Sequence, residues 1–259
     1  MSSASRTLAL FRKDTKYTTR LFIPVLLYLV IPLALMAFLG EGMRRFVNHL
    51  GYPNSNGSEF IVPGQLVLFS FMFTEHIGLF LYSEHTWGVW NRVRATRATM
   101  REILTAKVLD WILHMVVFTT VLLAVGGALF DLPAPSSWPG LAALLGGLVV
   151  CAIGYGFCGF VLSPSNAVFD AWTYVGTLVL TALGGALVPL EVLPSWARTV
   201  APVSPMYWFM KGSRHLYLDG LGFGSVGGPV GALVAFGAGF GLIGAWRFDP
   251  NAIKVGRDR

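Results

Sequence analysis

Six stretches of the chain are apolar over about the thickness of a membrane, and they define the elements that we predict. Residues 21–39 contain no charged side chain, and a spanning helix needs about 20 mainly apolar residues. The pattern therefore predicts an all-α polytopic membrane protein in which residues 1–259 form one transmembrane domain. Its six spans cover residues 21–39, 61–82, 103–130, 141–162, 167–190 and 223–248.

The segment before the last span, residues 191–220, is apolar but interrupted by Pro194, Pro202 and Pro205. The part after Pro205 has about 14 residues and would measure roughly 21 Å as a helix, which is too short to cross a bilayer. We therefore predict a re-entrant helical hairpin that dips into the membrane or lies on it.

Apolar and basic side chains alternate along residues 1–20. This alternation predicts a short helix on the inner membrane surface, with its basic residues toward the headgroups. A frayed basic tail is the alternative. The apolar side chains are Leu8, Leu10, Phe11 and Tyr17, and the basic ones are Arg6, Arg12, Lys13 and Lys16.

Charge is scarce in this chain and unevenly placed. Charged residues make up 12% of it, against about 25% in soluble domains, so an ordinary soluble protein is excluded. Six spans put both termini on one side, and with that side inside, 14 of the 19 lysines and arginines are inside. The positive-inside rule then predicts cytoplasmic termini and an external hairpin. Because this rule explains the basic surplus, we expect no nucleic-acid partner.

Motifs that would give the chain its own chemistry are missing. The sequence has no phosphate-binding G-x-x-x-x-G-K-[ST], no G-x-S-x-G and no H-E-x-x-H. Cys151 and Cys158 lie seven residues apart, or roughly 10 Å along a helix, which is too far for a disulfide. We expect no catalytic residue, no metal site and no cofactor bound by this chain.

Polar groups inside the predicted spans are functional candidates, because ionisable residues are costly in a membrane. Glu75 and His76 lie well inside the second span. The fifth span carries a threonine stripe that could line a pathway or bond to its own helix carbonyls. This stripe consists of Thr173, Thr177 and Thr181.

Two further patterns concern packing in the second and sixth spans. Phe69 and Phe73 share one face of the second span, where they could form a cavity wall or face lipid. In the sixth span, small residues recur every fourth position at Gly227, Gly231, Ala235 and Gly239. Small residues at this spacing let helices approach closely, so we predict that the stripe packs within the subunit, with a flexible hinge as the alternative.

The loop after the second span, "SEHTWGVWNRVRATRATMREILTAKVL", combines basic residues with two tryptophans. By composition alone it is typical of a positive-inside loop with interfacial tryptophans. It also resembles the coupling-helix region of ABC-2 type transporter permeases. The residues that carry the resemblance are Glu84, Trp87, Gly88, Arg92, Arg94, Glu102, Ile103, Leu104 and Lys107.

A second block, "GGALVPLEVLPSWARTVAPVSPMYWFMKGSRHLYLDG", resembles the stretch that follows the fifth span in the same family. The matching residues are Gly184, Gly185, Pro189, Leu193, Pro194, Trp196, Ser204, Pro205, Tyr207 and Trp208. The two blocks cover about a quarter of the chain, and the span count, length and predicted topology also agree with the family.

The resemblance implies a permease subunit in a bacterial plasma membrane, part of an exporter that uses ATP by alternating access. Two copies of a separate ATPase would bind ATP and Mg²⁺ and dock on the coupling region, residues 83–102. A second, identical permease subunit would complete the transporter. The expected coupling residues are Glu84, Trp87, Gly88, Trp90, Arg92 and Arg94.

The resemblance also implies that the second and fifth spans line the route of the cargo and that the hairpin closes its exit. The expected pathway residues are Phe69, Phe73, Glu75, His76, Thr173, Thr177 and Thr181, and the expected gate residues are Pro194, Trp196, Pro205, Tyr207 and Trp208. We expect a small amphipathic or lipophilic cargo such as a drug or antibiotic. Export of a lipid or glycan, a secondary transporter and an intramembrane enzyme remain alternatives.

Overall fold

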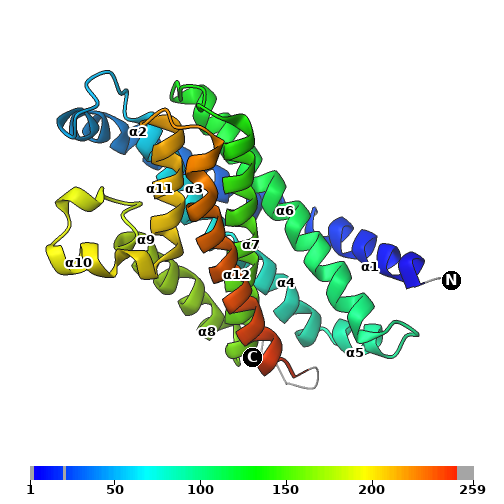
Figure 1. The fold of residues 1–259 in the computed structure, drawn as a ribbon. Coiled ribbons are helices and arrows are strands. Elements are labelled where there is room, and N and C mark those ends of the chain that lie inside the picture. Colours follow the sequence, from blue (N-terminus) through cyan, green and yellow to red (C-terminus); the bar gives the residue numbers. More distant parts are fainter. Residues whose placement is uncertain (1–2, 20–21, 250–259) are drawn as a thin grey trace.

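A computed structural model of the protein describes residues 3–19 and 22–249. Within these ranges all regular structure is helical (Figure 1). Met1, Ser2, Arg20, Leu21 and residues 250–259, which form the predicted cytoplasmic tail, lie outside the described residues.

Five stretches are long and apolar enough to cross a membrane, and they coincide with five of the six predicted spans. The first helix, however, continues ten residues beyond its predicted end at residue 39. The five are built from α2 (Phe22–His49), α3 (Ser58–Met72) with α4 (Thr74–Thr86), α6 (Met100–Leu129), α7 (Trp138–Leu162) and α12 (Gly227–Arg247) with the preceding 3₁₀ turn η4 (Phe223–Val226).

The fifth predicted span is shorter than expected and is not among these five. Helix runs from α8 (Asn166–Ala171) through a π-helical turn, η1 (Trp172–Gly176), into α9 (Thr177–Leu183). It stops at Gly184, because Gly185 adopts a left-handed conformation with φ 75° that ends the helix. The predicted boundary at residue 190 is therefore seven residues too late.

The segment before the last span contains two short helices, α10 (Ser195–Val200) and α11 (Pro205–Tyr217). The 3₁₀ turn η2 (Leu190–Val192) precedes α10, and the 3₁₀ turn η3 (Ala201–Val203) precedes α11. Pro205 occupies the first turn of α11, where its missing N–H costs nothing, and the Ser204 side chain caps this turn. Figure 1 shows α10 projecting from the side of the bundle.

Helix α3 is the centre of the bundle and contacts α2, α6, α7, α9 and α11. Its side chains are buried on all faces over most of its length. Phe69 and Phe73 are both buried, so neither faces lipid. Phe73 instead stacks on Phe118 of α6, with ring centroids 4.4 Å apart.

The close helix contact in the last span uses a different face from the one predicted. A Cβ added to Gly231 or Gly239 would meet no atom within 4 Å, whereas one added to Gly237 would lie 2.7 Å from the Val150 carbonyl oxygen of α7. The small-residue stripe of Gly227, Gly231, Ala235 and Gly239 therefore faces away from the subunit, and the prediction that it packs inside was wrong. Counting small residues alone did not identify the face, since Gly237 and Leu233 carry the contact.

The N-terminal residues form α1 (Ser3–Thr18), which lies along α6 (Figure 1). Two of the basic side chains expected at the headgroups are engaged within the chain instead. Arg6 pairs with Glu102 at 2.8 Å, and Lys13 pairs with Glu84 at 2.7 Å. These contacts fix α1 at the end of the bundle that carries the coupling region.

Candidate functional site

The coupling region is a helix–bend–helix at one end of the bundle, beside α1 (Figure 1). Helix α4 ends at Thr86, and α5 (Val89–Arg94) begins after Gly88. Gly88 has φ 69°, a left-handed conformation that favours glycine. After α5 the chain turns, and Thr99 with Glu102 forms a capping box that starts α6. The sequence thus specifies a rigid bend on each side of α5.

The two tryptophans of this region have opposite environments. Trp87 is 55% exposed, whereas Trp90 is 5% exposed and stacks on His85 with ring centroids 5.0 Å apart. Arg92 and Arg94 are exposed on α5. Trp87 and the two arginines can therefore meet a partner, but Trp90 holds α5 against its own subunit.

Glu84 is also inside the chain and is not part of an exposed docking surface. Its carboxylate pairs with Lys107 of α6 at 2.5 Å and with Lys13 of α1 at 2.7 Å. Asp14 lies against the same two lysines, and burial raises the pKa of its carboxyl although both lysines oppose the shift. Sequence reasoning missed Lys13 and Asp14, because nothing local links residues about 70 positions apart.

Glu75 belongs to a chain of polar groups that leads from the interior to the surface. The Tyr28 hydroxyl donates to the Glu75 carboxylate at 2.9 Å and lies 3.1 Å from the Tyr174 hydroxyl. Glu75 is buried, whereas Tyr174, on the π-helical turn, is partly exposed. Neither tyrosine was among the predicted site residues. Single-turn π-helices occur often at functional sites.

His76 is buried beside Phe73, and neither of its ring nitrogens has a hydrogen-bond partner among the described residues. The ring centroids of the two residues lie 5.4 Å apart. Buried polar atoms are usually paired, so this histidine is a candidate for contact with water or cargo.

The threonine stripe faces into the subunit. Thr173, Thr177 and Thr181 are all fully buried, and Thr181 donates to the Thr177 carbonyl oxygen at 2.6 Å. For Thr181 this is the bond to the helix's own backbone that was the alternative to a pathway, whereas the Thr173 hydroxyl has no hydrogen-bond partner among the described residues. The exposed face of this helix carries Tyr174, Val175, Leu178 and Val179 instead.

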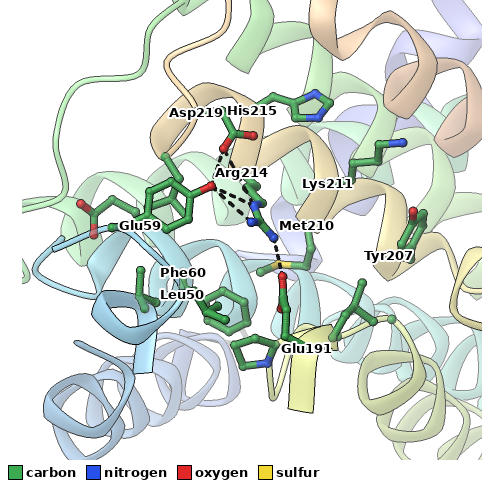
Figure 2. Close-up of a pocket in the computed structure, with 17 residues that line it drawn as sticks. Leu50, Glu59, Phe60, Glu191, Tyr207, Met210, Lys211, Arg214, His215 and Asp219 are labelled. Atoms are coloured by element: carbon green, nitrogen blue, oxygen red, sulfur yellow. Dashed lines mark hydrogen bonds and ion pairs between the residues drawn. The ribbon is translucent and has the colours of Figure 1, made fainter. Parts of the chain in front are cut away.

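At the opposite end, a pocket of about 380 Å³ lies between the α2–α3 loop, the turn after α9 and helix α11 (Figure 2). Apolar side chains form much of its lining, and charged groups gather at its mouth. The main apolar residues are Val47, Leu50, Phe60, Leu190, Met210 and Leu218.

Arg214 joins the three segments around this pocket (Figure 2). Its Nη1 donates to Glu191 Oε1 at 2.7 Å, and its Nε and Nη2 donate to the Tyr52 hydroxyl at 3.3 and 3.2 Å. Tyr52 donates in turn to Asp219 at 2.5 Å. Burial and this bond raise the pKa of Tyr52, so its hydroxyl stays protonated as a donor.

Of the predicted gate residues only Tyr207 lines this pocket, and the five differ in environment. Pro205 is buried. Trp208 donates from Nε1 to the Pro202 carbonyl oxygen at 2.9 Å, which ties the two halves of the hairpin together. Pro194 and Trp196 are exposed on the projecting part, Trp196 to 64%.

Among the described residues, no group of three or more His, Cys, Asp or Glu side chains is placed to hold a metal ion. Cys151 and Cys158 are both free and buried. Of the ionisable interior groups, Glu75 and Glu84 contact other helices, whereas His76 has no hydrogen-bond partner among the described residues.

Comparison with known proteins gives the family. The model of the ABC-2 type transporter family matches residues 1–218, which include the coupling region, the polar interior and all of the pocket lining except Asp219. No curated protein matches the chain. The chain therefore belongs to the ABC-2 type transporter family and is a multi-pass membrane permease component of an ABC transporter, whose ATP is hydrolysed by a partner ATPase subunit.

Proposed function

We propose that this chain is the permease of a bacterial plasma-membrane exporter that moves a small amphipathic or lipophilic molecule, such as a drug or antibiotic, out of the cell. Two identical permease subunits and two ATPase subunits form the transporter, and the ATPases bind ATP and Mg²⁺. The observation that carries the proposal is the exposed basic and aromatic surface of the coupling region at one end, with an amphipathic pocket at the other.

Both termini lie in the cytoplasm, with the coupling region beside them. This orientation follows from the excess of basic residues at the α1 and α5 end. It requires a sixth crossing, which α8, η1 and α9 provide with 6, 5 and 7 residues. Eighteen residues measure about 27 Å as a helix, close to the roughly 30 Å of a hydrocarbon core.

The ATPase docks on Trp87, Arg92 and Arg94, the exposed side chains of the predicted coupling set. Interfaces are enriched in aromatic residues and arginine, and a few such residues supply most of the binding energy. Gly88 fixes the bend that presents Trp87, while Trp90 and Glu84 hold the segment from inside.

Cargo passes along the surface of the second and fifth spans at the junction of two permease subunits. In this arrangement Tyr28 and Tyr174 form a hydrogen-bond chain that links buried Glu75 to the surface along which the cargo moves. The threonines and the two phenylalanines support the route from behind, because they are buried within one subunit.

The hairpin closes the exit, and Arg214 holds it to the α2–α3 loop and to Glu191. The pocket beneath this network has the size of a small-ligand site, which is typically about 300–1,000 Å³. Its mixed apolar and charged lining favours an amphipathic cargo. Export of a lipid or a glycan is the second candidate.

Reconstitution tests the proposal. The permease is purified with a candidate ATPase and reconstituted in inside-out vesicles. Ethidium or a fluorescent phosphatidylethanolamine is then added to the outer medium. We expect co-elution of the two proteins and ATP-dependent uptake of ethidium. Uptake without ATP but with a proton gradient would contradict the proposal, and uptake of the lipid alone would favour the second candidate.

A further inference from the structure

Four charged side chains meet where α1, α4 and α6 come together, at the base of the coupling region. The side chains of Asp14, Glu84 and Lys107 are only 3%, 5% and 4% exposed, and Lys13 closes the group from the surface at 40%. Charges removed from water are stable only when other charges and hydrogen bonds compensate them. The four groups must therefore be arranged so that each buried charge is compensated by its neighbours.

Cations and carboxylates alternate around a closed ring. Lys13 Nζ lies 2.7 Å from Asp14 Oδ1 and 2.7 Å from Glu84 Oε1. On the other side, Lys107 Nζ lies 2.5 Å from Glu84 Oε2 and 3.6 Å from Asp14 Oδ2. The ring has two positive and two negative charges, so each charge depends on two neighbours that come from different helices.

Contacts on either side of the ring extend this junction along α6. Ser3 and Arg6 hold Glu102 at 2.6 and 2.8 Å, before the ring. Thr15 donates to Asp110 at 2.7 Å, after the ring. Three places on the first turns of α6 thus hold α1 parallel to it, and a sliding motion would separate buried charges.

We propose that this ring positions the coupling helix, so that α1, the end of α4 with α5, and the start of α6 move as one body when the ATPase displaces α5. Lys107 and Glu84 are positioning residues, since they touch each other and α1 but not the partner. Glu84 lies four residues before Gly88, where the chain bends into α5. The inference rests on the proposed function, because it needs an ATPase that pushes on α5.

Variants that remove one or two charges of the ring distinguish a role in positioning the coupling helix from a role in folding. Lys107→Met leaves two carboxylates against Lys13 alone, so we expect a lower unfolding temperature and less complex with the ATPase. Glu84→Gln with Lys107→Met leaves the Lys13–Asp14 pair balanced, so we expect near-normal stability. Exchange of the two, Glu84→Lys with Lys107→Glu, should be no more stable than Lys107→Met, because like charges then adjoin Lys13 and Asp14.

Distances between spin labels read the position of α5 directly. Labels are placed on cysteines introduced at Arg12 of α1 and Asn91 of α5, both exposed, while the native cysteines are buried. In complexes diluted with unlabelled permease, so that one copy carries both labels, we expect one narrow distance distribution that is the same with and without ATP. In the balanced double variant we expect a broad distribution and a loss of at least tenfold in ATP-dependent ethidium uptake. Lys16→Met, an exposed lysine of α1, is the matched control and should change neither.

Two results would overturn the inference. One is a wild-type distance that shifts by several ångströms with ATP, because the segments would then not move together. The other is a double variant with a narrow distribution and normal uptake, which would make the ring a purely structural feature. If the wild-type complex moves no ethidium with ATP, the proposed function fails on that probe, and the distance distributions still decide the positioning role.

Discussion

Trp87 and Trp90 show how one backbone conformation decides the role of a side chain. Three residues apart, they would share a face of a continuous helix. Gly88 lies between them in a left-handed conformation, so α4 and α5 are separate helices and the two rings point into different environments. The helical spacing in the sequence was therefore misleading, although the glycine that breaks it was visible.

Truncation of each tryptophan should have a different effect. Trp87→Ala removes an exposed ring, so we expect a change in subunit stability within about 0.5 kcal/mol. We also expect a loss of about 2 kcal/mol in ATPase affinity, which is roughly 30-fold. Trp90→Ala opens a cavity behind α5 and should cost about 3–5 kcal/mol of subunit stability. Thermal unfolding of the isolated subunit and titration of the ATPase onto permease in nanodiscs measure the two quantities.

The two variants control for each other. If Trp87→Ala binds the ATPase normally, Trp87 is outside the docking surface. If Trp90→Ala leaves the unfolding temperature unchanged but abolishes binding, the original prediction that Trp90 meets the partner would be restored.

Helices, in contrast, were largely predictable, because hydropathy is a local property of the chain. Five predicted spans correspond to observed helices. Two errors concern the early end of α9, which the left-handed Gly185 sets, and the buried face of α12, which packing against α7 decides. The charged ring was not predictable at all, since Lys13 and Glu84 are 71 residues apart. Periodicity finds an element, but not the partner that an element packs against.

The contact of α7 with α12 should be sensitive to one glycine and insensitive to another. Gly237→Val places a side chain against the Val150 backbone, which cannot move aside cheaply, so we expect the helices to separate and the unfolding temperature to fall by several degrees. Gly231→Ala fills open space and raises helix propensity by up to about 1 kcal/mol. Thermal unfolding of the isolated subunit in detergent compares the two. A larger loss from Gly231→Ala would contradict this assignment of faces.

The Arg214 network should control access to the pocket behind it. Arg214 and Glu191 are 42% and 38% exposed, and such a pair is worth up to about 1 kcal/mol. Arg214→Ala should therefore raise the rate at which an impermeant maleimide labels a cysteine at Met210, a buried pocket residue, by about fivefold. Lys211→Met changes a residue that lines the pocket but makes no contact in the Arg214 network, so it is the control and should leave the rate unchanged. Equal rates in all three proteins would show that the network does not close the pocket.

At the scale of the whole molecule, the two ends differ in their charge, and apolar helices form the bundle between them. The end with α1 and α5 carries the basic surplus of the sequence, and its buried charges are paired with one another. The other end holds the pocket and its mixed charges around Arg214. This polarity was readable from the sequence, whereas the pocket was not, because its lining comes from three segments that lie far apart in the chain.

The proposed orientation of the molecule rests on that polarity and can be measured on intact cells. Single cysteines at Asn54, in the α2–α3 loop, and at Thr96, after α5, are both exposed and lie at opposite ends. The positive-inside rule predicts that an impermeant maleimide labels Asn54→Cys from outside, and Thr96→Cys only after permeabilisation. The buried native cysteines give little background. Labelling of Thr96→Cys on intact cells would reverse the orientation and place the coupling region where no cytoplasmic ATPase could reach it.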